Sequence, residues 1–261
     1  MRHNSNQSEI HPFPEGYPQE GLLEGRNALQ EALRSGRTID KVWVAAGDTD
    51  RNLARLTSEA KEQGAVVIPV DRRKLDSMSI THAHQGVIAL AAARPYATLD
   101  DIFALAESRG EAPLIVVCDE LSDPHNLGAI IRSAECAGAH GVVIPKRRSA
   151  GLTPVVAKAS AGAIEYMPVA RVSNISSALK ELQARGVWVY GTAADGTQEL
   201  FDANFQGPTA IVIGNEGAGM GRLVRQTCDV LVRIPMRGRI SSLNASAAAA
   251  ILLYEAVRQR S

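Results

Sequence analysis

The chain has 261 residues, 45% of them hydrophobic and 21% charged, and its formal net charge is +0. The length suits one large or two small domains, and the balanced charge excludes a global field that attracts nucleic acid, so RNA contacts need a local basic cluster. Cys118, Cys136 and Cys228 form no Cys-x-x-Cys pair, which argues against a zinc site or a disulfide framework. No apolar run reaches about 18 residues and no signal-peptide core is present, so we expect a cytoplasmic protein with no membrane span.

The first part of the chain predicts a tail and a small domain. Residues 1–21 are polar and proline-rich and predict a disordered tail. Residues 22–93 predict a small α/β domain, with helices at 27–34 and 51–63 and strands at 41–46, 65–70 and within 84–92. The composition shifts at Arg94-Pro95, and residues 94–112, with one short amphipathic helix, are interpreted as a linker.

Residues 113–261 show a regular alternation of strand and helix patterns. The expected strands cover 114–119, 141–145, 164–169, 186–192, 209–214 and 230–235, and the expected helices lie near 126–138, 154–161, 175–185, 219–227 and 243–259. This alternation predicts a mostly parallel sheet with helices on both faces. Ligands of such sheets bind beyond the carboxyl ends of the strands, so the loops there are expected to carry the chemistry.

The first such loop is DELSDPHNLGAIIRSAECAG, residues 119–138. Asp123 and Pro124 suit a helix start. Asn126 and Arg132 are less than two helical turns apart, so both can border one opening. Taken alone, the loop is explained at least as well by a capped helix that carries a surface arginine. His125 is interpreted as a loop residue.

The second loop is IVIGNEGAGMGRL, residues 211–223, a glycine-rich turn that leads into a helix. Glycines let the backbone approach a ligand closely, and a helix start favours anions. The dinucleotide-binding pattern nevertheless fails, because Gly219 is followed three residues later by Arg222. Glu216 would repel a phosphate, so the loop suits a cationic or hydroxyl-bearing ligand better.

The third loop is IPMRGRISSLNASAAAAI, residues 234–251. Ser241 or Ser242 can cap the following helix, and alanines 247–250 allow very close packing. A small-residue packing helix does not explain Asn244 and Ser246, because a buried amide without a hydrogen bond costs about 1–3 kcal/mol. These polar residues therefore indicate a partner.

Together the three loops resemble a known family. Asn126-x-Gly128-x-x-x-Arg132, Gly214-x-Glu216-Gly217-x-Gly219, and Ile234-Pro235-Met236-x-Gly238 leading to Ser242-Leu243-Asn244-x-Ser246 resemble, in order and spacing, the three motifs of the SpoU (TrmH-like) RNA ribose 2′-O-methyltransferases. The likeness covers roughly residues 113–258. Residues 22–93, with GRNAL at Gly25 and HQGVIAL at His84, resemble the small L30e-like substrate-binding domain of the guanosine 2′-O-methyltransferases that act on 23S ribosomal RNA.

The resemblance implies the SPOUT fold, a parallel sheet whose C-terminal part is threaded as a trefoil knot. The alanine-rich helix would pass through a chain loop, where small side chains fit. The knot would bind S-adenosylmethionine, and the residues expected to contact it are Gly214, Asn215, Gly217, Ile234, Met236, Leu243 and Ser246. The resemblance also implies a homodimer through the knot, with active sites completed by both protomers.

The resemblance further implies that Arg132 lies next to the ribose 2′-hydroxyl, supported by Asn126, Glu216, Ser242 and Asn244. A guanidinium is effectively always protonated, so positioning of hydroxyl and phosphate is a better assignment for Arg132 than general base. Glu216 orients Arg132 or takes the proton through water; the sequence leaves both open.

Basic side chains are the candidates for RNA contact. They are Lys146, Arg147 and Arg148 after the second large-domain strand, Arg237 and Arg239 in the third loop, and Arg26 in the small domain. A solvated face is the alternative for each one. His82 and His84 lack other ligands at metal-binding spacing, so no metal is expected.

The favoured function is methylation of a guanosine 2′-hydroxyl in 23S ribosomal RNA. Close alternatives are the same reaction on transfer RNA, or on a ribosomal adenosine where it confers antibiotic resistance. A non-catalytic RNA-binding protein is a second class. A doubly wound nucleotide-dependent enzyme is a third, and predicts NAD or ATP binding without RNA affinity.

Overall fold

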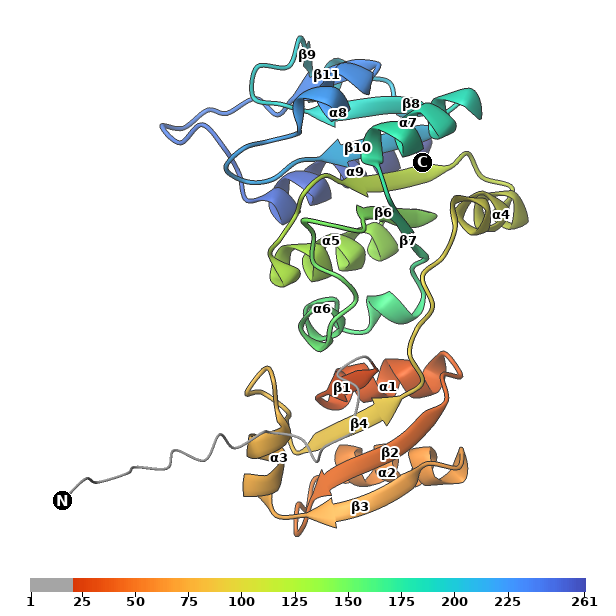
Figure 1. The fold of residues 1–261 in the computed structure, drawn as a ribbon, viewed down its shortest axis with the longest axis vertical. Coiled ribbons are helices and arrows are strands. Elements are labelled where there is room, and N and C mark those ends of the chain that lie inside the picture. The colour runs from red at the N-terminus through yellow and green to blue at the C-terminus, as the bar shows by residue number, and fades with distance from the viewer. Residues whose placement is uncertain (1–20) are drawn as a thin grey trace, which may run out of the picture. The chain divides into compact units, whose positions relative to one another are not determined.

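The computed structural model describes residues 21–261 (Figure 1). The tail predicted for residues 1–21 therefore lies, apart from Gly21, outside the described residues. The chain divides into two compact units, Met1–Ala93 and Arg94–Ser261, called here the N-terminal and C-terminal units. No helix of the described part is long and apolar enough to cross a membrane.

In the described part of the N-terminal unit, three helices pack against a four-stranded sheet. Its elements are β1 (Leu22–Glu24), α1 (Arg26–Arg34), β2 (Ile39–Ala45), α2 (Arg51–Glu62), β3 (Val66–Val70), α3 (Arg72–Met78) and β4 (Val87–Ala91). The strand order is β1-β4-β2-β3, with β2 and β3 parallel and β4 antiparallel to both its neighbours. β1 and α3 are absent from the sequence prediction. Leu75 and Met78 of α3 are fully buried beside Trp43 and Ile88.

The C-terminal unit is built on a seven-stranded sheet of order β7-β6-β5-β10-β8-β11-β9, in which every neighbouring pair is parallel. Its strands are β5 (Leu114–Cys118), β6 (Gly141–Pro145), β7 (Val169–Val172), β8 (Trp188–Thr192), β9 (Gln198–Glu199), β10 (Thr209–Ile213) and β11 (Val230–Arg233). Its helices are α4 (Leu99–Arg109), α5 (Pro124–Cys136), α6 (Pro154–Ala159), α7 (Ile175–Ala184), α8 (Arg222–Thr227) and α9 (Ala245–Arg260). The α/β class and the parallel sheet predicted from the alternation are confirmed.

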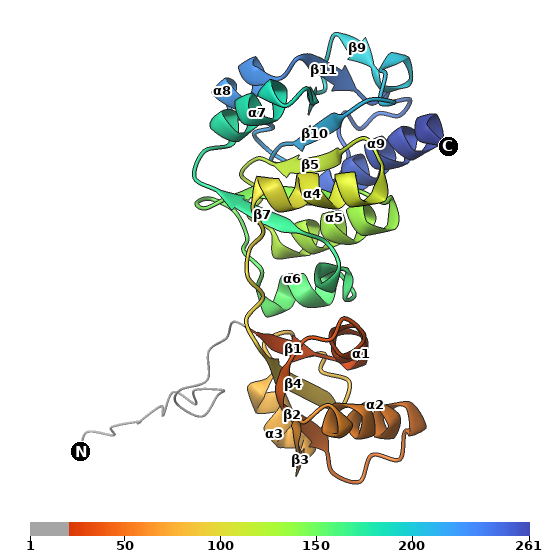
Figure 2. The same ribbon diagram turned by 90° about the vertical axis from the view of Figure 1, so that its right-hand side faces the viewer.

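Burial on both faces of this sheet explains its sequence pattern. Every residue of β5, β6 and β10 is buried, as expected for parallel strands covered on both sides. Ile102 of α4, Leu179 of α7 and Val224 of α8 share one core cluster. Helices α5 and α9 pack on each other, and α9 packs on β10 on the face of the sheet opposite to α4, α7 and α8 (Figure 2).

Three sequence predictions for this unit need correction. Residues 94–112 are not a free linker, because Leu99, Ile102 and Ala106 of α4 are buried within the C-terminal unit. The strand expected at 164–169 lies later, at β7, which begins after Pro168; residues Ala163–Glu165 form a buried 3-10 turn. The helix expected from 219 begins at Arg222, because Gly219 has a left-handed backbone with φ of 69°.

Candidate active site

The loops that follow four neighbouring strands meet at the carboxyl edge of the C-terminal sheet. Strands β5, β10, β8 and β11 are adjacent and parallel, so their carboxyl ends lie side by side. The loops after β5, β10 and β11 are the three that the sequence singled out. The loop after β8, residues 193–197, lies between two of them in the strand order and was missed, because it carries only one charged residue, Asp195, and one glycine, Gly196.

Asn126, Glu216 and Asn244, one residue from each of the three loops, form a hydrogen-bonded group that we call the amide–carboxylate cluster. The Glu216 Oε1 atom accepts hydrogen bonds from Asn126 Nδ2 at 2.7 Å and from Asn244 Nδ2 at 2.6 Å. Asn244 Nδ2 also donates to Asn126 Oδ1 at 2.9 Å. Glu216 and Asn244, which lie 90 and 118 positions after Asn126 in the chain, thus meet Asn126 in one cluster. The partner indicated by Asn244 is this cluster.

Asn244 has a second function as the N-cap of α9. Its Oδ1 accepts from the backbone N–H groups of Ser246 at 2.9 Å and Ala247 at 3.3 Å, and from the Ser246 hydroxyl at 2.6 Å. These contacts satisfy amides that the first turn of a helix leaves free. Neither Ser241 nor Ser242 is the cap. The alanines that follow, with Ala245 and Ala249 buried, allow α9 to lie close against α5.

The start of α5 is fixed in a similar way. The Asp123 side chain accepts from the His125 N–H, and Pro124 occupies the first turn, as predicted. Gly128 lies against α6: a Cβ there would be 2.4 Å from the Ala159 Cβ. Close packing of α5 on α6 therefore requires this glycine and holds Asn126, which is 5% exposed, in the cluster.

The glycine-rich loop after β10 is held by polar contacts to the loop after β5. Asn215 Oδ1 accepts from the Gly217 N–H at 2.9 Å, and Asn215 and Gly219 exchange backbone hydrogen bonds. The Asp119 Oδ2 atom accepts from the Gly221 N–H at 2.7 Å. Burial raises the pKa of the Asp119 carboxyl above its usual value. These hydrogen bonds therefore fix the conformation of the loop.

The residues expected to bind the cofactor lie in this loop, in the loop after β11 and at the start of α9. Met236 and Leu243 are 37% and 40% exposed, large for apolar side chains, and Ile234 is half-buried. A Cβ at Gly217 would meet only Asn215 Oδ1, at 3.7 Å, so open space adjoins the loop backbone. Exposed apolar side chains and open glycine backbone at the same edge of the sheet fit a ligand with a flat aromatic base, as S-adenosylmethionine has.

The structure does not join Arg132 and Ser242 to the amide–carboxylate cluster. Both are exposed, and neither side chain makes a hydrogen bond or ion pair within residues 21–261. Arg132 lies six residues after Asn126 on α5, which is about 9 Å along the axis and about 240° around it. The two side chains therefore project from different sides of the helix.

The six predicted RNA contacts fall into two groups. Lys146, Arg147, Arg237 and Arg239 are exposed, and no side-chain hydrogen bond or ion pair to the described part of the chain holds them. Arg148 pairs with Glu120, with 3.0 Å between Nη1 and Oε1. Arg26 lies 2.7 Å from Asp50 and donates to the Gln85 carbonyl.

His84 is engaged within the N-terminal unit. Its Nε2 lies 2.9 Å from Asp76 Oδ1, and its Nδ1 accepts from the Gly86 N–H. Within residues 21–261, no three His, Cys, Asp or Glu side chains are grouped as metal ligands would be.

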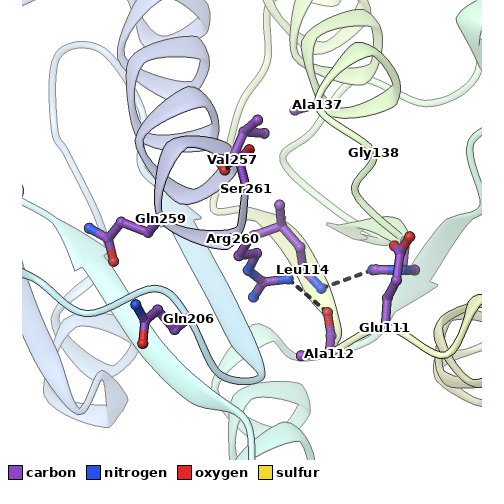
Figure 3. Close-up of a pocket in the computed structure, with 11 residues that line it drawn as sticks. Glu111, Ala112, Leu114, Ala137, Gly138, Gln206, Val257, Gln259, Arg260 and Ser261 are labelled. Atoms are coloured by element: carbon purple, nitrogen blue, oxygen red, sulfur yellow. Dashed lines mark hydrogen bonds and ion pairs between the residues drawn. The ribbon is translucent and has the colours of Figure 1, made fainter.

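A cavity of about 550 Å³ lies at the opposite, amino edge of the same sheet (Figure 3). Its lining includes Glu111, His140, Gln259 and Arg260. Arg260 donates to the carbonyls of Phe205, Ala112, Pro113 and Gly207, at 2.6 to 3.2 Å. These polar groups are used to hold the chain, so the cavity does not compete with the carboxyl edge as the active site.

Comparison with known proteins identifies the family. The model described as the SpoU rRNA Methylase family matches residues 113–254, and the one described as RNA 2′-O ribose methyltransferase substrate binding matches residues 22–97. The chain belongs to the SpoU methyltransferase family. Its membership confirms the predicted reaction class, an RNA methyltransferase, and the predicted SPOUT relationship.

Individual relatives agree. A Bacillus subtilis protein described as a TrmH family tRNA/rRNA methyltransferase, YacO, is 49% identical over 93% of this chain and 97% of its own length. The 23S rRNA (guanosine-2′-O-)-methyltransferase RlmB of Ralstonia nicotianae is 46% identical over 92% of this chain and 96% of its own. The SpoU methyltransferase AviRb of Streptomyces viridochromogenes, solved in complex with the cofactor AdoMet, superposes with a TM-score of 0.80 at 31% identity and covers 92% of this chain and 89% of AviRb.

Proposed function

We propose that this protein transfers a methyl group from S-adenosylmethionine to the ribose 2′-hydroxyl of a guanosine in 23S ribosomal RNA. The observation that carries the proposal is the amide–carboxylate cluster, in which three motifs distant in sequence meet, one of them the glycine-rich loop. The guanosine and the 23S target rest on the 46% identity to a protein described with that activity.

S-adenosylmethionine, when bound, supplies a methyl group already activated on a sulfonium. The protein positions the hydroxyl and handles its proton. Backbone at Gly214, Asn215 and Gly217 approaches the cofactor, with Ile234, Met236 and Leu243 as its apolar neighbours. Ser246, bonded to Asn244, orders the start of α9 beside it. The missed loop at 193–197 completes the lining, since it follows β8 between β10 and β11.

Glu216 is our candidate for the proton acceptor. Its Oε1 takes the donors from Asn126, Asn244 and the Ala245 N–H, whereas no donor from the described residues bonds to Oε2. One oxygen is thus fixed in place and the other is available to a ligand. A fixed carboxylate with one free oxygen can accept a hydroxyl proton directly or through one water. Arg132 positions the hydroxyl or an adjacent phosphate, since its guanidinium keeps its proton.

The position of Arg132 supports the proposal of a homodimer. Within one chain Arg132 and Asn126 project from different sides of α5, so one copy does not assemble the full set. Ile251 and Tyr254, 38% and 53% exposed on α9, add apolar surface to the helix that packs on α5. We therefore propose that a second copy covers this surface and brings Arg132 to the cluster. The knot threading stays a prediction, as does binding of RNA by residues 22–93.

Transfer RNA is the second candidate substrate, because the relative at 49% identity is described as a tRNA/rRNA methyltransferase. The family model for substrate binding at residues 22–97 favours neither RNA. Whether the target in ribosomal RNA is adenosine or guanosine is decided only by identifying the methylated nucleoside that the reaction yields.

The test uses purified protein, tritiated S-adenosylmethionine and unmodified 23S ribosomal RNA, with Arg132→Ala and the charge-retaining Arg132→Lys beside wild type. Wild type should transfer label that is recovered as 2′-O-methylguanosine. Arg132→Ala should lose transfer, and Arg132→Lys should keep part of it. Label recovered on adenosine corrects the base, label only on transfer RNA corrects the substrate, and no transfer to any RNA despite cofactor binding rejects the enzymatic function.

A further inference from the structure

The turn after β6 carries three basic residues in a row, and the third differs from the first two. Lys146 and Arg147 are exposed, with side chains that no described residue holds. Arg148 donates from Nη1 to Glu120 Oε1 at 3.0 Å. Arg148 and Glu120 also share a left-handed backbone, with φ of 58° and 54°. Residues with side chains rarely adopt this conformation, and it persists where surrounding contacts impose it.

Glu120 connects this turn to the glycine-rich loop. Its carbonyl oxygen accepts from Asn215 Nδ2 at 3.1 Å. Asn215 in turn accepts from the Gly217 N–H at 2.9 Å. A continuous series of contacts thus runs from Arg148 through Glu120 and Asn215 to the loop that is proposed to meet the cofactor. Each link joins residues that are distant in sequence or that fix the loop backbone.

Other contacts hold the backbone of the basic turn without Arg148. The Ala150 N–H donates to the Leu121 carbonyl at 2.9 Å, and the Leu152 N–H donates to the Tyr96 hydroxyl at 3.1 Å. Arg171 donates to the Lys146 carbonyl at 3.1 Å while its guanidinium lies over the Tyr96 ring. The turn therefore presents Lys146 and Arg147 to solvent on a backbone that needs no ion pair from Arg148.

We propose that Arg148 is a positioning residue for the cofactor loop and that Lys146 and Arg147 alone are the RNA contacts of this turn. The inference rests on the proposed function. Through Glu120 and Asn215, Arg148 holds the glycine-rich loop in the shape that receives the cofactor. One of its guanidinium nitrogens is bonded to the Glu120 carboxylate, and the negative charge of that carboxylate opposes the approach of a phosphate. The three neighbouring basic residues thus divide into two functions that their sequence does not distinguish.

The test compares Arg147→Gln, Arg148→Gln and Glu120→Gln with wild type in two assays. Calorimetry measures binding of S-adenosylmethionine, and filter binding measures how the affinity for a 23S transcript falls with salt. Arg147→Gln should lower the salt slope by about 0.7 to 0.9, the share of one phosphate contact, and leave cofactor affinity unchanged. Arg148→Gln and Glu120→Gln should each weaken cofactor binding about two- to five-fold, as expected for an exposed ion pair, with the salt slope unchanged.

The double variant Glu120→Gln with Arg148→Gln separates the pair from two independent effects. Cofactor affinity no lower than in either single variant supports the pair, because the second change then has nothing left to remove. A lower salt slope in Arg148→Gln with wild-type cofactor affinity overturns the inference and restores Arg148 as a phosphate ligand. Wild type that binds neither cofactor nor RNA overturns the proposed function and this inference with it. Glu120→Gln keeps every basic residue, so it decides the question if Arg148→Gln fails to fold.

Discussion

Arginines at the two edges of the C-terminal sheet are used in opposite ways. At the carboxyl edge Arg147, Arg237 and Arg239 are exposed, with guanidinium groups that no described residue binds. At the amino edge Arg260 gives its guanidinium to four backbone carbonyls beside the cavity of Figure 3. The first arrangement leaves charge available to a ligand. The second supplies donors to the Phe205 and Ala112 carbonyls, which no other described residue bonds.

Carboxylates and amides show the same contrast. Glu216 at the carboxyl edge gives one oxygen to the cluster and keeps the other available. Gln259 at the amino edge uses both ends of its amide, accepting from the Phe205 N–H and donating to the Ala203 carbonyl. A large cavity alone therefore does not identify an active site. Polar groups with an unbonded donor or acceptor distinguish the functional edge. Polar groups that are fully hydrogen-bonded within the chain distinguish the structural edge.

The largest expected effect is on catalysis, in Glu216→Gln. A glutamine oxygen can still accept from Asn126 and Asn244, so the cluster should persist, but the free carboxylate oxygen is replaced by an amide group. We expect kcat to fall about 10³-fold, within the range for loss of a general base. Thermal unfolding should change little. Near wild-type turnover in single-turnover methylation assays would remove Glu216 from proton transfer and leave it a purely positioning residue.

The next effect is on stability, in Arg260→Ala. Loss of the guanidinium leaves the Phe205 and Ala112 carbonyls without a donor from the described residues, whereas Thr209 still donates to the carbonyls of Pro113 and Gly207. The free energy of unfolding should therefore fall by about 3 kcal/mol. Methylation per folded molecule should be unchanged. The matched control is Arg239→Ala, an exposed arginine at the other edge, which should change stability by less than about 0.5 kcal/mol and weaken RNA binding. Urea unfolding measures the free energy of unfolding of both variants. Equal destabilisation by the two would contradict the contrast between the edges.

The sequence predicted the parts of this fold that local pattern controls. The apolar runs of β5 and β10 predicted buried parallel strands, and Asp123-Pro124 predicted the start of α5. The pattern at 164–169 misled, because Ile164 is buried in a 3-10 turn and burial alone does not define a strand. Helix α3 was missed because Leu75 and Met78 are its only buried residues, although Asp71 offered a capping signal.

The site was predictable in its residues but not in its geometry. Resemblance selected Asn126, Glu216 and Asn244, and the structure brings these three together. The six-residue spacing of Asn126 and Arg132 on a helix already implies that they project from different sides, but no sequence pattern showed that Arg148 pairs with Glu120 while Arg147 does not. Such differences depend on contacts between residues far apart in the chain, here 28 positions for Arg148 and Glu120.

A smaller effect separates the two functions of Asn244. Asn244→Ala removes the N-cap of α9 and should cost about 1 kcal/mol of stability. Asn244→Ser can restore the cap but not the amide donor to Glu216, so stability should recover while methylation stays low. Urea unfolding and methylation assays on both variants give the two readings. If serine restored activity together with stability, the cap alone would matter and the amide donor to Glu216 would be dispensable.

The smallest effect concerns pH at the structural edge. Burial lowers the pKa of His140, which accepts from the Leu114 N–H at Nδ1 and bonds to Glu111 at Nε2; the Glu111 contact opposes the shift only in part. On acidification, the unfolded chain therefore takes up this proton first. The stability that His140 contributes is fully present above about pH 6.5, falls as the pH drops below that value, and levels off below the lowered native pKa.

His140→Asn should remove this part of the pH dependence, because an asparagine oxygen can replace Nδ1 as acceptor but does not titrate. His82→Asn, at an exposed histidine with φ of 51°, is the matched control and should keep it, since asparagine tolerates a left-handed backbone. Urea unfolding between pH 5 and 8 measures the difference. If His140→Asn kept the wild-type slope of stability against pH, the pH dependence would belong to another group. A profile that becomes flatter would show that a histidine fully used for structure makes this edge sensitive to acid.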